Sequence, residues 1–380
     1  MNLNYLMPTR IIMGENCLFN ERSLLAQLGK KACMITGKHS ARACGGYDDA
    51  VKALEANGQQ YVLYDGVMNN PTDNCVFEAG ELAGKEGCDF ILAIGGGSPM
   101  DAAKAAAVLA AHMLSKEELF ALSFDKVLPI AAVPTTAGTG SETTPYSILV
   151  DTAGPAKRSI GSPLLFPRFA FLDHRYLRRL GRDTTVHTAM DALSHAVEGI
   201  LSPRANCISD TLARETIAII RNCFGPLMDF PADPAEFPAE IRKKLLLASS
   251  MAGMVISQTG TTVNHSMGYQ LTINWGTDHG RATGLLLGPF LRWCREKERA
   301  DSSIKPRIPG LCAALGMDLE DFCAVLENLL GKRERASEAE LGAWGKIKMK
   351  NAVNTYIEPC QEEIADIFRK ASGGGRNGAE

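Results

Sequence analysis

The chain has 380 residues, of which 46% are hydrophobic and 22% are charged, a composition typical of a globular enzyme of roughly two or three domains. The formal net charge is −3 and no sustained run of lysine and arginine occurs, which argues against nucleic acid or a membrane surface as the main partner. Eleven cysteines without a C-x-x-C pair indicate free thiols, and no stretch approaches about 18 apolar residues, so we expect a cytoplasmic protein.

The first part of the chain alternates between strand-like and helix-like segments. This alternation predicts a parallel, doubly wound sheet with helices on its faces. The strand-like runs are Lys31–Thr36, Gln60–Tyr64, Phe90–Ile94 and Val127–Val133, and the helix-like segments between them are Asp48–Ala56, Cys75–Lys85 and Met100–Ala111.

A glycine turn follows the third strand-like run. Gly95-Gly-Gly-Ser98 leads through Pro99 into a helix, and we expect Ser98 and Asp101 to form a capping box at its start. Glycines let backbone amides approach a phosphate at the positive end of a helix, so the turn predicts a pyrophosphate site, with a merely flexible turn as the alternative. Gly373–Gly378 matches G-x-G-x-x-G without a preceding strand, and we interpret residues 373–380 as a disordered tail.

After about residue 180 the chain contains long helical segments and no comparable strand-like run. This change predicts a separate all-helical domain that begins near Arg182. We therefore expect a dinucleotide-binding α/β domain over residues 1–181 and a helical metal-binding and substrate domain over residues 182–372. The helical segments include Asp210–Cys223, Ala239–Ser257, Thr283–Glu298 and Leu319–Leu330.

One carboxylate and three imidazoles in this second part form a candidate metal site. Asp191 and His195 stand four residues apart in a segment of helical composition, so both side chains leave the same helix face. His265 and His279, fourteen residues apart, add two more imidazoles. Three nitrogens and one oxygen suit Fe(II) or Zn(II) and leave room for a substrate oxygen. The alternatives are core or surface histidines, and His187, one turn before Asp191, is the rival ligand.

Four blocks of the sequence resemble the iron-containing (group III) alcohol dehydrogenases in order and spacing, over nearly the whole chain. The resemblance implies an N-terminal Rossmann-like domain and an all-α C-terminal domain, an architecture shared with dehydroquinate synthases, and commonly a homodimer. The blocks are Gly95-Gly-Gly-Ser-Pro-Met-Asp-Ala-Ala-Lys104, Pro134-Thr-Thr-Ala-Gly-Thr-Gly-Ser-Glu142, Asp191-Ala-Leu-Ser-His-Ala-Val-Glu198 and the stretch from His265 to His279.

The resemblance also assigns roles to individual residues. It implies that the metal ligands are Asp191, His195, His265 and His279. It implies that the cofactor meets Gly96, Gly97, Ser98 and Asp101 at the pyrophosphate, Thr135, Thr136, Thr139 and Thr144 on the adenosine and ribose side, Lys157 at a ribose hydroxyl, and Asn70. For the threonines, Lys157 and Asn70, the alternative is an ordinary loop, surface or turn role.

Three positions depart from the family pattern. Tyr269 stands where the family usually has a histidine near the nicotinamide, and we consider it a candidate catalytic relay. Asp278 replaces the proline that commonly precedes the last ligand. Gly37 stands where many relatives place an aspartate that reads the adenosine ribose, and Lys38 follows it, which predicts a preference for NADP(H) over NAD(H).

The resemblance implies a metal-dependent oxidoreductase that interconverts a primary alcohol and an aldehyde or small ketone. The cation, Fe²⁺ or Zn²⁺, would draw charge from the substrate oxygen while a hydride moves to or from the nicotinamide of NAD(P). The alternatives are a hydroxyacid-oxoacid transhydrogenase and a glycerol or 1,3-propanediol-type dehydrogenase. More distant alternatives are a dehydroquinate synthase-like lyase and a non-catalytic binding protein.

Overall fold

The computed structural model describes residues 3–153, 156–331, 336–347, 349 and 351–372, and the predicted tail at 373–380 lies outside these residues. The described chain packs as two compact units. The first unit comprises Leu6–Gly181 and Pro231–Ser257, and the second comprises residues 3–5, Arg182–Phe230 and residues 258–372. The domain boundary between residues 181 and 182 stays a prediction.

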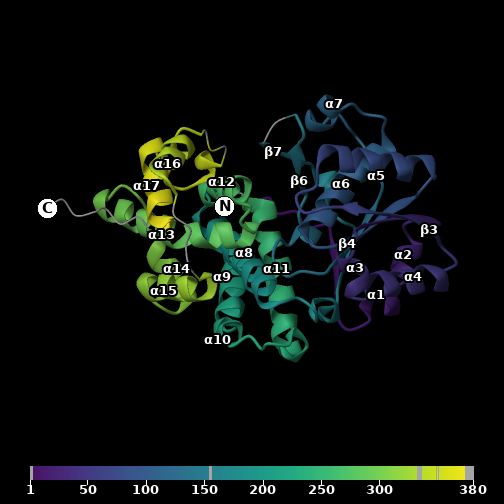
Figure 1. The fold of residues 1–380 in the computed structure, drawn as a ribbon, viewed down its shortest axis with the longest axis horizontal. Helices are drawn as coiled ribbons and strands as arrows, with labels where there is room; N and C mark the ends of the chain where they lie inside the picture. Colours follow the sequence, from purple (N-terminus) through teal and green to yellow (C-terminus); the bar gives the residue numbers. More distant parts are fainter. Residues whose placement is uncertain (1–2, 154–155, 332–335, 348, 350, 373–380) are drawn as a thin grey trace. The chain divides into compact units, whose positions relative to one another are not determined.

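A six-stranded parallel sheet forms the centre of the first unit, as the alternating pattern predicted (Figure 1). Strands β4, β5 and β8 are buried at every residue, because helices cover both faces of the sheet. In sheet order the strands are β1 (Arg10–Met13), β8 (Phe169–Leu172), β5 (Ile130–Pro134), β4 (Phe90–Gly95), β2 (Lys31–Gly37) and β3 (Gln60–Val67).

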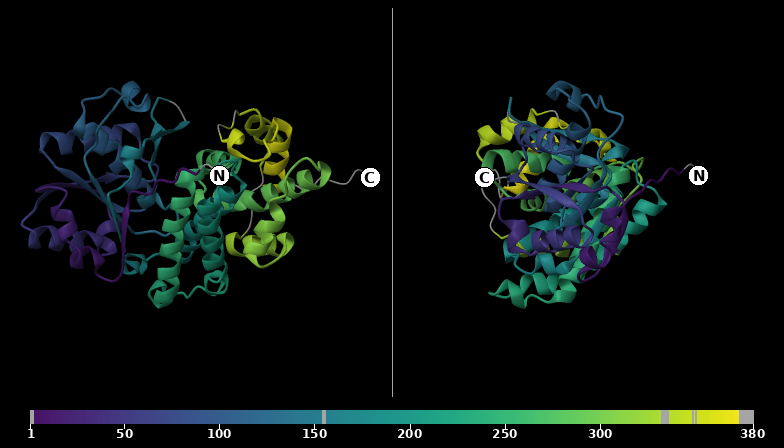
Figure 2. Two further views of the ribbon diagram at one scale, coloured as in Figure 1. Left: turned by 180° about the vertical axis from the view of Figure 1, so that it is seen from behind. Right: turned by 90° about the vertical axis from the view of Figure 1, so that its right-hand side faces the viewer.

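Helices α5 and α6 lie on one side of the sheet and α1, α3 and α4 lie on the other, in both opposite views (Figures 1 and 2). Helix α6 is rich in buried alanine, so it packs closely against β4 and α5. The helices before the hairpin are α1 (Cys17–Asn20), α2 (Ser23–Ala26), α3 (Ser40–Ala43), α4 (Gly46–Ala56), α5 (Asp73–Lys85), α6 (Gly97–Ala111) and α7 (Lys116–Phe120). The predicted strands did not include β1, β8 or the antiparallel hairpin of β6 (Tyr146–Asp151) and β7 (Ala156–Gly161).

Within the first unit, residues 231–257 pack against the short loop that follows β5. Thr143 Oγ1 donates a hydrogen bond of 2.9 Å to the carbonyl of Ser250, and the Ser250 hydroxyl contacts the buried Glu142 carboxylate. Most of helix α11 (Ala239–Thr259) lies in this segment. The short 3-10 helices of the first unit are η1 (Ser141–Thr143), η2 (Pro163–Leu165), η3 (His174–Leu177) and η4 (Pro234–Glu236).

The second unit contains helices and no strand among its described residues, which confirms the predicted all-helical region. Helix α8 is its central element: it packs against α9 and α13, and every residue from 189 to 202 is buried. The helices are α8 (Arg182–Leu201), α9 (Cys207–Arg221), α10 (Phe224–Met228), α12 (Val263–Trp275), α13 (His279–Ala300), α14 (Ile308–Leu315), α15 (Leu319–Leu330), α16 (Glu338–Gly345), η5 (Ala352–Asn354) and α17 (Gln361–Ala371).

The strand order of the sheet reverses between β2 and β4. The chain passes from β2 outward to β3, and then returns to β4 and continues to β5 and β8 on the opposite side. Thr36 pairs with Ile94 and Gly95 pairs with Pro134, so the carboxyl ends of β2, β4 and β5 lie along one edge. Open α/β sheets bind ligands at this edge, at the point where the order reverses.

All eleven cysteines are free thiols, as predicted. No helix in the described part of the chain combines the length and the apolar character that a membrane crossing requires. The fold therefore depends on packing and hydrogen bonds rather than on disulfides.

Candidate functional site

Three ionisable side chains lie on one buried stretch of α8. Asp191, His195 and Glu198 are at most 5% exposed, although the surrounding residues of the helix form apolar core. Burying a charged or polar group is costly unless it is paired. Their positions, four and three residues apart, put them on one face of the helix, where a common partner can meet them.

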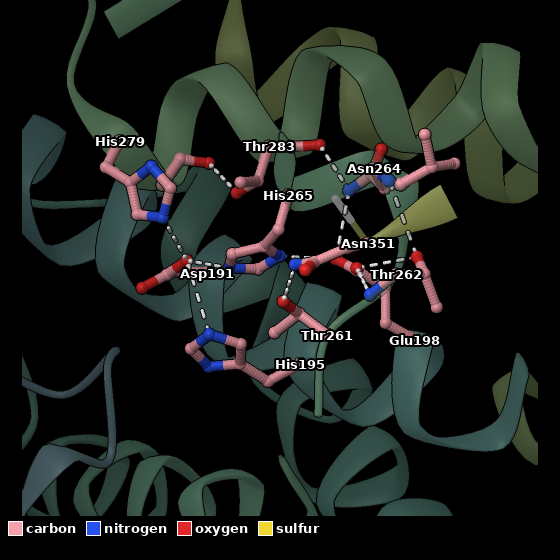
Figure 3. Close-up of polar contacts among 12 residues, drawn as sticks. Asp191, His195, Glu198, Thr261, Thr262, Asn264, His265, His279, Thr283 and Asn351 are labelled. Atoms are coloured by element: carbon pink, nitrogen blue, oxygen red, sulfur yellow. Dashed lines mark hydrogen bonds and ion pairs between the residues drawn. The ribbon is translucent and has the colours of Figure 1, made fainter. Parts of the chain in front are cut away.

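The imidazoles of His195, His265 and His279 converge on one oxygen of Asp191 (Figure 3). From Asp191 Oδ1 the distances are 3.9 Å to His195 Nε2, 3.5 Å to His265 Nε2 and 3.8 Å to His279 Nε2. Ligand atoms of a tetrahedral site with bonds of about 2.1 Å lie about 3.4 Å apart, so this spacing approaches that of a filled site. Among the described residues, the group able to hold a metal ion consists of Asp191, His195 and His265, and His279 approaches it from α13.

The positions of the two later histidines follow from how their helices begin. His265 is the third residue of α12 and His279 is the first residue of α13. A side chain at Gly280 would meet the backbone carbonyl of His187 at 2.0 Å, so only glycine lets α13 start this close to α8. That close approach brings His279 to Asp191.

The site fits a divalent cation. Asp191 Oδ1 and His265 Nε2 are buried and neither has a hydrogen-bond partner within the described residues, although they face each other. Leaving such atoms unpaired costs about 1–3 kcal/mol each, and a cation at their centre would remove that cost. One carboxylate oxygen and three imidazole nitrogens suit Fe(II) or Zn(II).

The charges around the site also favour a divalent cation. Burial alone would raise the pKa of Asp191, but the rings of His195, His265 and His279 hold it well below its usual range. Burial would lower the pKa of His265, whereas the Glu198 and Asp191 carboxylates raise it to about 10. A cation that binds His265 Nε2 needs the lone pair of that nitrogen, so metal binding there competes with its protonation.

Glu198 lies behind His265, on the side opposite to Asp191 (Figure 3). Its Oε1 accepts hydrogen bonds from His265 Nδ1 at 2.5 Å and from Asn264 Nδ2 at 3.1 Å. Its Oε2 accepts from the backbone amide and the hydroxyl of Thr262, both at 2.7 Å. No role was predicted for Glu198, although its position three residues after His195, on the same helix face, was a signal in the sequence.

Tyr269 stacks on the ring of His279, with ring centroids 5.2 Å apart and an interplanar angle of 16°. His187, the rival ligand, instead pairs through Nδ1 with Asp278 Oδ2 at 2.9 Å. Asp278 immediately precedes α13 and is largely exposed. Tyr269 and Asp278, two of the departures from the family pattern, therefore lie next to His279. Tyr269 contacts its ring, and Asp278 precedes it in the chain.

Replacing Tyr269 by phenylalanine keeps this ring contact and removes only the hydroxyl. If the hydroxyl is the relay that replaces the missing histidine, we expect turnover to fall by about tenfold and its pH dependence to change. Tyr269→Leu removes the stack as well and should also weaken metal retention. The pH profile of kcat for both variants checks this, and a phenylalanine variant with an unchanged profile would leave only the packing role.

The residues predicted to bind the cofactor gather at the carboxyl edge of the sheet. Gly37 ends β2, Asn70 follows β3, the glycine turn follows β4, and the threonines of residues 135–144 follow β5. The backbone amide of Asn70 donates to Ser98 Oγ at 3.1 Å, which ties the turn after β3 to the start of α6.

The glycine turn and the threonine loop contact each other directly. A side chain at Gly96 would meet Thr136 at 2.9 Å and one at Gly97 would meet Thr139 at 2.7 Å. Glycine is therefore required here for loop packing as well as for the approach of a phosphate. The predicted capping box is wrong: α6 begins at Gly97, its N-cap is Gly96, and no side chain caps it.

Asp101 cannot cap α6 because its carboxylate is engaged elsewhere. It accepts hydrogen bonds from Ser141 Oγ at 2.9 Å and from the amide of Ile148 at 3.1 Å. The fully buried Lys104, one turn later, donates to Ser141 O and Oγ at 2.7 Å, to Thr144 Oγ1 at 3.1 Å and to Tyr146 O at 2.8 Å. Burial lowers the pKa of Lys104 to about 8, although Asp101 and Glu142 oppose the shift.

Lys104 thus joins α6 to the loop that carries the predicted cofactor threonines, a role that was not predicted from the sequence. Two other lysines were predicted to face the cofactor. Lys157 lies in β7, and Lys38 follows β2. Lys38 is exposed to solvent. The predicted contacts of all these residues with the cofactor stay predictions.

Lys104→Met should lower the free energy of unfolding by about 3–5 kcal/mol, because it leaves buried acceptors and the Asp101 carboxylate without their cation. Urea denaturation measures this loss. Lys85→Met is the matched control: Lys85 makes an exposed pair with Glu81, and its replacement should change stability little. Equal stability of the two variants would contradict the proposed role of Lys104.

Two family models match successive parts of the chain. Residues 8–174 match the model of iron-containing alcohol dehydrogenase, and residues 185–372 match the model of the C-terminal part of the Fe-containing alcohol dehydrogenase family. Together the two matches cover most of the chain and include every residue that the metal and dinucleotide predictions name.

Known proteins resemble the chain over nearly its full length. A crystal structure of an iron-containing alcohol dehydrogenase from Thermotoga maritima is 39% identical, has a TM-score of 0.85, and is matched over 97% of this chain and 99% of that one. The 1,3-propanediol dehydrogenase of Citrobacter freundii is 33% identical over 97% of both chains. A sulfoacetaldehyde reductase from Bifidobacterium kashiwanohense, solved in complex with NAD⁺, is 27% identical, with a TM-score of 0.87, over 99% of this chain and 100% of that one.

Proposed function

Because the chain belongs to the iron-containing alcohol dehydrogenase family, we propose that it reduces a short aldehyde to its primary alcohol, or the reverse, with Fe²⁺ and NADP(H). The observation that carries this proposal is the convergence of three histidine nitrogens within 3.9 Å of one buried Asp191 oxygen. Family membership gives the reaction class, whereas the substrate and the dinucleotide preference are our proposals.

In this proposal the divalent cation, when bound, supplies a Lewis acid that draws charge from the substrate oxygen. Asp191, His195, His265 and His279 hold it, and the Asp191 carboxylate offsets part of its charge. The glycine turn and the amino end of α6 hold the dinucleotide through its pyrophosphate. Hydride transfer then needs the carbinol carbon and C4 of the nicotinamide at reacting distance, and no covalent intermediate with the protein.

The proposed preference for NADP rests on the end of β2. A carboxylate there would repel a 2′-phosphate, at a cost of about 1–4 kcal/mol for charges ~4 Å apart. Gly37 carries no such charge. It pairs with Val67 of β3, directly after Thr36, which pairs with Ile94 of β4, and the exposed Lys38 follows it. The Bifidobacterium relative was solved with NAD⁺, but the cofactor of that protein does not determine the preference of this chain.

Anaerobically purified protein, assayed with NADPH and a panel of short aldehydes, tests the proposal. The panel should include an aldehyde that also carries one hydroxyl group, because a 1,3-propanediol dehydrogenase is among the relatives. We expect NADPH oxidation with at least one member. A transhydrogenase would oxidise no free NADPH but would transfer hydride between a hydroxyacid and an oxoacid, and that result would replace the proposal. We also expect a homodimer, which light scattering in solution checks.

A further inference from the structure

Glu198 is a fully buried carboxylate that is not one of the proposed metal ligands. It is 0% exposed, and its two oxygens accept four hydrogen bonds from three residues. A buried charge with this many donors is held in one position. Three of the donors, on Thr262 and Asn264, come from the start of α12 and the fourth comes from the ring of His265 on the same helix.

The ring hydrogen bond determines which nitrogen of His265 is available to a metal. A carboxylate only accepts, so His265 Nδ1 must carry the hydrogen that lies between it and Glu198 Oε1 at 2.5 Å. The other nitrogen, Nε2, then presents its lone pair, and it is the atom that faces Asp191 Oδ1. Outer hydrogen bonds of this kind orient a ligand ring and make it more basic.

We propose that Glu198 is a positioning residue that fixes the ring and the tautomer of His265 for the metal, through a network that links all three ligand-bearing helices. Glu198 is on α8 with Asp191 and His195. Asn264, on α12, donates to Glu198 and also to the carbonyl of Thr283 on α13 at 3.2 Å. The inference rests on the proposed metal site and adds a residue that determines its affinity.

Glu198→Gln is the sharpest test of this role, since glutamine has nearly the same shape. Its amide offers one acceptor oxygen and one donor nitrogen, and it cannot accept from Thr262 and His265 at once. If the oxygen faces Thr262, the amide nitrogen donates to His265 Nδ1 and moves the ring hydrogen to Nε2, where the metal binds. Losing an outer partner typically weakens metal binding by about 10–100-fold, and we expect that loss here.

Thr355→Val is the matched control for a merely structural effect. Thr355 Oγ1 accepts the hydrogen bond of the Val263 amide, at 3.1 Å, at the same end of α12, but it is not among the four donors that hydrogen-bond to Glu198. Both variants should lower the melting temperature. Only Glu198→Gln should lower the affinity for Zn²⁺, measured on the full chain by competition with a chelating dye, and circular dichroism should show that both variants are folded.

The outcomes separate this inference from the function on which it rests. Wild-type protein that takes up no Zn²⁺ or Fe²⁺ contradicts the proposed function itself. Wild-type protein that binds metal, with a Glu198→Gln dissociation constant within about threefold of it, overturns the role of Glu198 alone. Equal losses in the Thr355→Val control also overturn it, because a general loosening of α12 would then explain them.

A measurement on the unmodified protein covers the case in which Glu198→Gln does not fold. Nitrogen NMR of histidine-labelled, Zn²⁺-loaded wild-type protein should show His265 with its hydrogen on Nδ1 and the metal on Nε2. His265→Ala identifies the signal. A ring bound through Nδ1 would overturn the inference, because Nδ1 would then be unable to donate to Glu198.

Discussion

His265→Ala and Asp191→Ala are each expected to abolish turnover while the protein stays folded. Each change removes one ligand from the proposed four-ligand site without altering the sheet of the first unit. A bound metal contributes several kcal/mol to charge stabilisation, so we expect the rate to fall by more than about a thousandfold. The assay is steady-state turnover together with the metal content of each purified variant.

His112→Ala is the matched control for these two variants. His112 follows α6 in the first unit and contacts the carbonyl of Lys126, so its loss should change neither turnover nor metal content. Circular dichroism should show the helical content of all three variants to be that of the wild type. A His265→Ala protein that retained a near-normal rate after chelation would show that the metal assignment is wrong.

Gly37→Asp should reverse or erase a preference for NADP. We expect the unmodified protein to have the higher kcat/KM with NADP, because no carboxylate at the end of β2 repels the 2′-phosphate. The substitution introduces that charge, and a cost of about 1–4 kcal/mol corresponds to a loss of roughly 5- to 1000-fold in NADP efficiency. Kinetics with both dinucleotides measure it directly.

Crowding at Gly37 requires a control. A side chain there would meet the carbonyl of Val67 at 3.3 Å and Ser40 Oγ at 3.4 Å, so any substitution displaces its neighbours slightly. Gly37→Ala introduces this crowding without charge and should keep the preference for NADP. If the unmodified protein used NAD and NADP with equal efficiency, Gly37 and Lys38 would not determine a cofactor preference.

The sequence predicted the main architecture because its signals are periodic and local. The runs ending at Thr36 and Ile94 are continuous and apolar, as buried parallel strands are, and they form β2 and β4. The strands β1 and β8 have only four residues each, too few for a pattern, and they are strands because they pair with each other across the chain. Pairing between distant segments is not visible in local composition.

The candidate site was predictable to a similar extent. The spacing of Asp191 and His195 by one helical turn was visible in the sequence, but their meeting with His265 and His279 depends on how α12 and α13 begin beside α8. The capping box failed because Asp101 bonds with Ser141 instead, a contact set by tertiary structure. Glu198 was missed for the same reason, since a buried glutamate acquires a role only from the donors that fold around it.

If Asp191, His195, His265 and His279 hold a catalytic metal, turnover must depend on how much metal is bound. Protein prepared anaerobically and freed of metal by a chelator is loaded with increasing amounts of Fe²⁺, and its NADPH-dependent reduction of an active aldehyde is measured at each loading. We predict no turnover without metal and a linear rise that ends at one ion per chain. Turnover that is the same before chelation, after chelation and after reloading would contradict the assignment of Asp191, His195, His265 and His279 as the metal site of this enzyme.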